Sequence, residues 1–337
     1  MNIEHCPSCL KPGFNGFCLP CRKQLFHGRR VSPLLPFSRP DYNIHKRDSV
    51  KRLSISGVQS KHSVRLVGTE LSLTEEQGEF ILKPIMTGAL EHSDAMPANE
   101  HVTMQLASQI FGITTAACAV VFFSDDFSPA YLTRRFDIAP DKSRYQQEDF
   151  AQIAQVTEET HGKNYKYDFS YEKIAHLMKR YVSTYAIEIE KFFRLVIFNY
   201  LVQNGDAHLK NFSLIKQPLI GSYLLTPAYD LLNTRIHLPN ETAMALDLFD
   251  AEFETESYRV NGFHSRDDFT EFGRRIGIPE NRVHRIIENL LASGEKVDGL
   301  LNRSFLDAKS RTAYSAMVKE RLRAVGYSYK NSAHYSS

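Results

Sequence analysis

The feature that most constrains this chain is an apolar segment at residues 189–203 that runs directly into a polar loop. The segment has almost no polar face, which predicts a helix buried on all sides; its apolar side chains include Phe192, Phe193, Leu195, Val196, Phe198, Leu201 and Val202. The loop at residues 204–213 reads Asn-Gly-Asp-Ala-His-Leu-Lys-Asn-Phe-Ser. A rigid buried helix can position the polar groups of a functional loop. We therefore expect the functional site at this loop.

Three oxygen-bearing side chains in and after this loop match the needs of phosphoryl transfer. Asp206 stands five residues before Asn211, and Asp230 ends the string Thr-Pro-Ala-Tyr-Asp at 226–230. In a kinase, one carboxylate receives the proton of the attacking hydroxyl, while an amide oxygen and a second carboxylate hold Mg²⁺. The Asp-x-x-x-x-Asn spacing is that of a kinase catalytic loop, although Asn204 and Gly205 replace the usual His-Arg. Taken alone, the spacing is better explained by a polar turn that caps two elements.

The composition is that of an ordinary globular protein with one large or two medium domains. Of the 337 residues, 42% are hydrophobic and 24% are charged. The net charge of +2 provides no overall field for nucleic acid or an anionic membrane. The first residues are polar and no apolar run approaches the ~20 residues of a membrane-spanning helix, so we expect a cytoplasmic protein without a membrane partner. In that compartment the five cysteines are not expected to form stable disulfides.

Four of the cysteines form two Cys-x-x-Cys pairs within a predicted knuckle at residues 1–27: Cys6, Cys9, Cys18 and Cys21. Four thiolates can surround one Zn²⁺ tetrahedrally and leave no open position for catalysis. The eight residues between the pairs are fewer than in the commonest zinc motifs. A structural zinc ion and a reduced, metal-free cluster both remain open.

A β-rich N-terminal lobe is predicted at residues 51–140, after an extended linker at 28–50 that contains three prolines. The lobe begins with small and hydroxyl side chains around one glycine, and the backbone amides of such a loop can contact phosphates; the candidates are Ser56, Gly57, Val58 and Gln59. A surface hairpin turn is the alternative. The apolar strand at 79–84 carries Lys83, which occupies the place where kinases put the cation for the ATP phosphates; an exposed lysine at the end of the strand is the alternative.

Glu100 lies near the start of a predicted helix and has two predicted roles. It could pair with Lys83, as the helix-borne glutamate of kinases does, or it could serve only the helix N-terminus. The strand at 130–136 ends with Arg135 and Phe136, where free backbone groups could bind an adenine edge. Helical periodicity then predicts an all-helical lobe at residues 141–326 and a flexible tail at 327–337.

The order of these parts is that of a two-lobed protein kinase with an α+β fold, and seven strings resemble one family more closely. They are similar to strings of the HipA family, the serine/threonine kinase toxins of bacterial toxin–antitoxin systems: Ser-Ile-Ser-Gly-Val-Gln-Ser-Lys (54–61), Phe-Ile-Leu-Lys-Pro (80–84), Asn-Glu-His (99–101), Thr-Arg-Arg-Phe-Asp (133–137), Gln-Glu-Asp-Phe (147–150), the loop at 204–213 and Pro-Ala-Tyr-Asp (227–230). The resemblance covers about residues 50–290. The chain is shorter before residue 54 than full-length HipA proteins, in which respect it is similar to HipT, the short toxin of three-part HipBST systems.

The resemblance implies a role for each candidate residue of the site. Asp206 would be the catalytic base, with Lys210 steadying the transferred phosphoryl group and His208 bracing the loop. Asn211 and Asp230 would hold Mg²⁺. Among the remaining residues, Lys83 would bind the ATP phosphates, and Ser54 and Ser56 would be autophosphorylation sites. Phosphate on either serine would repel ATP and switch the enzyme off.

The resemblance also implies a substrate and partners. Members of the family phosphorylate aminoacyl-tRNA synthetases and so arrest translation, and the HipT likeness favours tryptophanyl-tRNA synthetase. A HipB-like antitoxin and a small HipS-like protein would be partners, with DNA reached only through the antitoxin. Two other classes of function remain open from the residues: a non-catalytic, DNA-associated corepressor component that uses the cysteine knuckle, and a small-molecule phosphotransferase.

Overall fold

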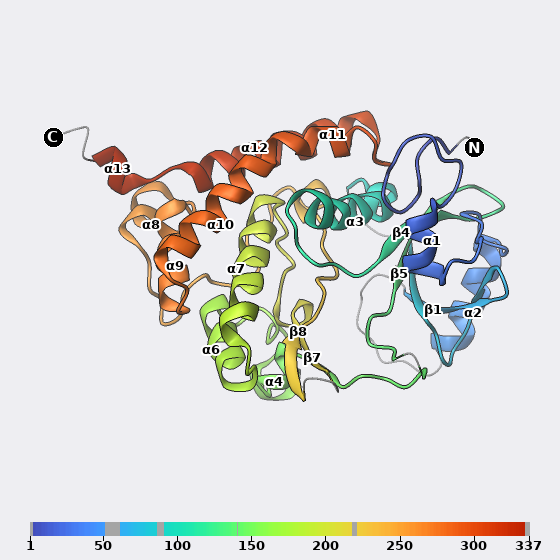
Figure 1. Cartoon of the computed structure of the whole chain (residues 1–337), viewed down its shortest axis with the longest axis horizontal. Helices are drawn as coiled ribbons and strands as arrows, with labels where there is room; N and C mark the ends of the chain where they lie inside the picture. Colours follow the sequence, from blue (N-terminus) through green and yellow to red (C-terminus); the bar gives the residue numbers. More distant parts are fainter. Residues whose placement is uncertain (1–2, 51–60, 86–90, 140, 218–220, 334–337) are drawn as a thin grey trace.

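The computed structural model describes residues 3–50, 61–85, 91–139, 141–217 and 221–333. Its N-terminal part contains a five-stranded antiparallel sheet with the strand order β2-β1-β3-β5-β4 (Figure 1). The strands are β1 (His62–Val67), β2 (Glu70–Leu73), β3 (Phe80–Pro84), β4 (Cys118–Phe122) and β5 (Pro129–Arg134). Lys83 lies opposite Tyr131 of β5, so the predicted lysine is on the middle strand of the sheet.

The two faces of this sheet pack against different parts of the chain. Cys118 and Tyr131 join the main core, which also holds residues of α3 (Met96–Gln105). Ala119 and Val121 face the other way and pack with residues of the cysteine segment and its helix α1 (Leu19–Phe26). All five residues of β4 are therefore buried, which explains why this strand is a continuous apolar run. Cys118 is buried as predicted.

The predicted extended linker at residues 28–50 is wrong over its second half, which forms helix α2 (Arg39–Val50). Ser38 and Asp41 explain the helix start, because each backbone N–H donates to the other's side chain in a capping box. Pro40 lies in the first turn, where its missing N–H costs nothing. The first half of the segment hydrogen-bonds to β4 at Phe122, so the segment belongs to the sheet domain rather than bridging two domains.

The C-terminal part is mainly helical, with α7 (Tyr185–Leu201) at its centre (Figure 1). Eleven of the seventeen residues of α7 are buried, which confirms the predicted buried helix. The other helices are α4 (Phe150–Ile153), α5 (Glu158–His161), α6 (Tyr171–Tyr181), α8 (Glu256–Asn261), α9 (Arg266–Arg275), α10 (Glu280–Ser293), α11 (Val297–Leu301), α12 (Ala308–Gly326) and α13 (Tyr329–Ala333). Short helical turns occur at Ser93–Ala95, Leu106–Ile110, Leu209–Asn211, Thr234–Ile236 and Gly294–Lys296. None of the described helices is long and apolar enough to cross a membrane.

The prediction that this lobe is all-helical is wrong in one place. A three-stranded antiparallel sheet, β6-β7-β8, is formed by Gln147–Asp149, Ser213–Gln217 and Ser222–Leu225. Its middle strand β7 begins two residues after Asn211, so pairing on both edges fixes the exit of the polar loop. The strands are three to five residues long, too short to interrupt the helical pattern of the sequence. The predicted flexible tail also contains helix α13 in its described part.

Candidate active site

Three charged side chains from three separate segments meet at the end of β3. The ammonium of Lys83 lies 2.7 Å from Oε1 of Glu100 in α3, and it also contacts the carboxylate of Asp230. The side chains of Lys83 and Glu100 are buried, whereas that of Asp230 is 41% exposed. Glu100 lies in the second turn of a helix that begins at Met96, which is beyond the first turn, and its side chain pairs with Lys83.

Of the two carboxylates in this cluster, Asp230 is the one that can bind a further cation. Burial raises the pKa of Glu100 to about 7, although the nearby Lys83 ammonium acts to lower it. Burial also raises the pKa of Asp230, but the Lys83 ammonium outweighs it and the pKa ends below its usual value. For Lys83, burial lowers the pKa, but the two carboxylates outweigh it and the pKa ends above its usual value. Asp230 is thus ionised and partly open, next to a lysine that stays charged.

The polar loop after α7 is held by hydrogen bonds from its first residues. Gln203 has a left-handed backbone (φ 53°), which ends the helix. The side chain of Asn204 donates to Asn199 (3.0 Å) and accepts from the backbone N–H of Asp206 (3.3 Å). A Cβ at Gly205 would lie 2.6 Å from both the Glu241 carboxyl carbon and a backbone carbonyl oxygen, so only glycine fits there. Asp206 is therefore presented by a turn with a fixed shape.

Asp206 is the half-exposed carboxylate of this loop, with 49% of its side chain accessible. The Tyr167 hydroxyl donates a hydrogen bond to its Oδ1, and Nε2 of His208 lies 3.7 Å from the same atom. Burial lowers the pKa of His208 to about 4, although the Asp206 carboxylate acts to raise it. This imidazole is therefore neutral at pH 7. The Lys210 residue is exposed. Asp206 can therefore accept a proton from a molecule in solvent, while its neighbours orient it.

Tyr229, the residue before Asp230, ties its segment to the loop that carries Asn211. The Tyr229 hydroxyl donates to the backbone oxygen of Lys210 (2.8 Å), the residue before Asn211, and it also hydrogen-bonds to the Ser213 hydroxyl. Oδ1 of Asn211 is buried and has no hydrogen-bond partner among the described residues. A buried amide oxygen without a partner and an ionised carboxylate are both oxygen donors of the kind that Mg²⁺ prefers. Asn211 and Asp230 thus carry donor atoms that suit Mg²⁺, and their joint binding of one ion stays a prediction.

Two predicted nucleotide-binding regions have different outcomes. Ser54, Ser56, Gly57, Val58 and Gln59 lie outside the described residues, so the predicted phosphate loop stays a prediction.

At the predicted hinge, the backbone N–H of Arg135 is not free for adenine, because it donates to the backbone oxygen of Glu79 (2.9 Å). The Arg135 guanidinium forms a bidentate ion pair with the Asp137 carboxylate. Phe136 packs against Tyr229 with ring centroids 5.7 Å apart, so it lines the same region as Asp230.

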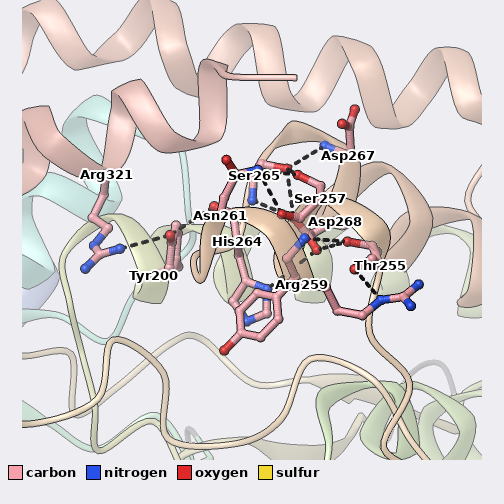
Figure 2. Close-up of polar contacts among 11 residues, drawn as sticks. Tyr200, Thr255, Ser257, Arg259, Asn261, His264, Ser265, Asp267, Asp268 and Arg321 are labelled. Atoms are coloured by element: carbon pink, nitrogen blue, oxygen red, sulfur yellow. Dashed lines mark hydrogen bonds and ion pairs between the residues drawn. The ribbon is translucent and has the colours of Figure 1, made fainter. Parts of the chain in front are cut away.

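A polar network behind α7 was not predicted from the sequence (Figure 2). The Tyr200 hydroxyl donates to the backbone oxygen of His264 (2.9 Å) and accepts from Arg321 of α12 (3.0 Å). Asp268, fully buried, accepts from the backbone N–H and the hydroxyl of Ser265, both at 2.7 Å. The network fixes the end of α7 from which the Asp206 loop departs. Tyr167 and Tyr229 were missed as well, because a tyrosine in an irregular segment has no spacing that marks its partner.

The four predicted cysteines form one cluster. The sulfur atoms of Cys6, Cys9, Cys18 and Cys21 all lie within 4.8 Å of one another, and all four residues are free cysteines. The Cys9 and Cys18 sulfurs are 3.7 Å apart. A tetrahedral site with Zn–S bonds of ~2.3 Å has sulfur–sulfur edges of about 3.8 Å. The cluster therefore has the dimensions of a closed four-thiolate zinc site.

Comparison with known proteins identifies relatives over most of the chain. The family model for the HipA-like C-terminal domain matches residues 53–297. A Haemophilus influenzae protein named "Putative kinase" is 28% identical over 325 residues, which cover 90% of this chain and 92% of that protein. The serine/threonine-protein kinase toxin HipA of Shewanella oneidensis is 26% identical over 265 residues, which cover 74% of this chain and 57% of the toxin. The chain thus spans just over half the length of that toxin.

Two solved structures share the fold. One is HipA from the Shewanella oneidensis complex of HipA, HipB and operator DNA, with a TM-score of 0.59 and 22% identity over 86% of this chain and 71% of that chain. The other is the Helicobacter pylori proinflammatory kinase CtkA, with a TM-score of 0.50 and 13% identity over 81% of this chain and 92% of that chain. The predicted fold class is confirmed: a kinase-like α+β fold with a β-rich N-terminal sheet and a helical C-terminal region.

Proposed function

Because the chain belongs to the family of HipA-like C-terminal domains, we propose that it is an ATP-dependent serine/threonine protein kinase that acts as a toxin of a bacterial toxin–antitoxin system. The observation that carries this proposal is the cluster of Lys83, Glu100 and Asp230. It joins a strand lysine, a helix glutamate and a loop aspartate, which are the parts that kinases use around the ATP phosphates. Asp206 and Asn211 add the base and the second metal ligand.

Each residue has a defined task in the proposed reaction. Asp206, held by Tyr167, accepts the proton of the acceptor serine or threonine hydroxyl. Lys83 neutralises phosphate charge, and Glu100 keeps its ammonium in place. Asn211 and Asp230 would hold Mg²⁺, which neutralises charge on the β- and γ-phosphates. The neutral His208 supports the loop beside Asp206.

Lys210 and the loop serines complete the proposal. Lys210 is exposed in the same loop as Asp206, and its charge would stabilise the phosphoryl group during transfer. Autophosphorylation of Ser54 or Ser56 would add about −1.5 to −2 charges next to the triphosphate. That charge would repel ATP and turn the kinase off.

The proposed acceptor is an aminoacyl-tRNA synthetase, with tryptophanyl-tRNA synthetase favoured by the likeness to HipT. Phosphorylation would leave its tRNA uncharged and arrest translation, which places the activity in the cytoplasm. A HipB-like antitoxin and a small HipS-like protein are the proposed partners. The relative from Shewanella oneidensis was solved with HipB and operator DNA, which supports contact with DNA through an antitoxin.

The test is to incubate the protein with cell extract and ATP labelled in its γ-phosphate, and to identify what becomes labelled. We expect label on a serine or threonine of one synthetase, and none with the Asp206→Asn variant. Label on a metabolite instead of a protein would contradict the proposal and indicate a small-molecule phosphotransferase. Equal labelling by Asp206→Asn would remove Asp206 from the reaction.

A further inference from the structure

The turn between Cys6 and Cys9 is tied to the kinase core through three consecutive backbone oxygens. The oxygen of Pro7 accepts from the backbone N–H of Val120 in β4 (2.9 Å). The oxygen of Ser8 accepts from Nε2 of His101 in α3 (2.7 Å). The oxygen of Cys9 accepts from the side chain of Gln109 in the helical turn that follows α3 (3.0 Å). The turn at residues 6–9 therefore contacts β4, α3 and the helical turn that follows α3.

The middle contact acts next to the proposed nucleotide site. His101 directly follows Glu100, and both side chains are buried. Since a carbonyl oxygen only accepts hydrogen bonds, Nε2 of His101 must carry the proton in this contact. A shift of the Ser8 oxygen would leave a buried donor unpaired or move the backbone of α3. Because Glu100 and His101 are neighbours in α3, such a shift would also act on the position of Glu100, which lies 2.7 Å from Lys83.

The cysteine segment has some contacts of its own that help to keep that shape, among them the backbone hydrogen bond from Cys6 to Lys11 (2.9 Å) and the fully buried Leu10 side chain. Its single helix α1 has eight residues, and a segment this short cannot bury a core of its own. Phe26 packs on Phe80 of the sheet (5.6 Å between ring centroids), so the helix side of the segment is anchored there. The turn at residues 6–9 lies on the other side, where Leu10 adopts a left-handed backbone (φ 61°) and donates back to the Cys6 oxygen. The four converging sulfurs are what join the turn to α1.

We propose that the four cysteines bind one structural Zn²⁺, and that this ion fixes α3 so that Glu100 reaches Lys83. The zinc centre would be separate from the Mg²⁺ site and would make ATP binding depend on a second metal. The dependence on ATP rests on the proposed kinase function, whereas the metal centre does not.

The metal centre is tested by measuring the zinc content of the whole protein as purified. We expect one zinc per chain, with X-ray absorption showing four sulfur neighbours at ~2.3 Å. The variants Cys6→Ser and Cys18→Ser should lose the metal, whereas Cys118→Ala, which removes a buried thiol of β4 outside the cluster, should keep it. Wild-type protein without zinc would overturn the proposal, and so would full zinc retention in the Cys6→Ser, Cys18→Ser double variant.

Should the serine variants fail to fold, the Cys118→Ala protein still decides the question. Titration of its four remaining cysteines with a mercurial reagent should release one zinc as four thiols react. Release of less than a tenth of an equivalent would contradict the site.

The link to α3 is tested with His101→Leu, which removes the donor, and His101→Gln, whose amide can replace Nε2 as a donor. We expect His101→Leu to keep its zinc but to bind a Mg²⁺-loaded ATP analogue at least about tenfold more weakly. His101→Gln should recover most of the affinity. Unchanged affinity in His101→Leu and in zinc-stripped wild type would overturn the link. If wild type bound no ATP at all, the proposed function would fail, while the zinc measurements would still stand.

Discussion

At the residue scale, the loop that carries Asp206 depends on Gly205 having no side chain. A Cβ there would meet the backbone oxygen of Thr242 at 2.6 Å, and backbone cannot yield as a flexible side chain can. We expect Gly205→Ala to lower kcat by at least tenfold by displacing Asp206, and to cost about 1–3 kcal/mol of unfolding free energy through overpacking. Steady-state kinetics and urea denaturation measure the two effects.

Gly299 in α11 is the matched control, because a Cβ there meets nothing within 4 Å. Gly299→Ala should leave kcat unchanged and stabilise the protein by about 0.5–1 kcal/mol, since alanine is the better helix former. Equal kinetics in Gly205→Ala and wild type would show that the loop does not require this close approach.

Single residues also show how much of the candidate site could be predicted from the sequence. Lys83 was assigned from its position on a strand, and pairing with Lys83 was one of two roles predicted for Glu100; the structure brings the two side chains into contact. Tyr167 and Tyr229 could not be assigned, because their partners lie 39 and 19 residues away in loops without periodicity. The backbone N–H of Arg135 was predicted to be free, but it donates to the Glu79 oxygen. The sequence alone does not show that these two segments lie side by side.

At the scale of elements, α9 begins with a buried capping box whose carboxylate belongs to Asp268. Burial raises the pKa of Asp268, but His264, Thr255 and Ser265 outweigh it, so the pKa in the folded protein is below its usual value. The unfolded chain then binds the proton more tightly, and the stabilisation is present above about pH 4 and is lost as the pH falls through the folded value.

We therefore expect Asp268→Asn to lower the free energy of unfolding by about 1–3 kcal/mol at neutral pH. The difference from wild type should shrink as the pH falls below about 4. Urea denaturation across this pH range measures it, with Asp141→Asn in an exposed turn as a control that should change little. A difference that does not vary with pH would contradict the ionised state of Asp268.

Elements were predicted well where one physical rule decides them. The apolar pattern of α7 leaves no face for solvent, so its burial followed from the sequence. Helix α2 was missed because the prolines of its segment suggested an extended chain, although Pro40 falls in the first turn, where helices accept it. The strands β6, β7 and β8 were missed because three short strands from distant segments gain their stability only by pairing.

At the scale of the whole molecule, two structures outside the catalytic motifs hold α3 from opposite sides. The cysteine segment contacts it through His101, and α12 contacts it through the Tyr314 hydroxyl, 2.8 Å from the Thr103 hydroxyl. Both segments lie far from α3 in the sequence but beside it in the fold (Figure 1). The helix that carries Glu100 is thus the point where the two lobes and the cysteine cluster meet.

The predicted two-lobed α+β architecture followed from the order of motifs along the chain, and the solved relatives confirm the fold class. The contacts of the turn at residues 7–9 with β4 and α3 could not be predicted, because they use backbone oxygens, which every residue has. The four cysteines can be recognised in the sequence. The backbone carbonyls of Pro7, Ser8 and Cys9, which connect the cluster to the core, cannot.

The central claim is that Asp230, Asn211, Lys83 and Asp206 form one site for Mg²⁺, ATP and proton transfer. Its most direct measurement is γ-phosphate transfer from ATP to protein, with Mg²⁺-dependent binding of an ATP analogue measured on the same samples. We predict that Asp206→Asn binds the analogue like wild type but transfers at least about a hundredfold more slowly, and that Asp230→Asn loses both Mg²⁺-dependent binding and transfer. Wild-type transfer and binding in Asp230→Asn would contradict the account.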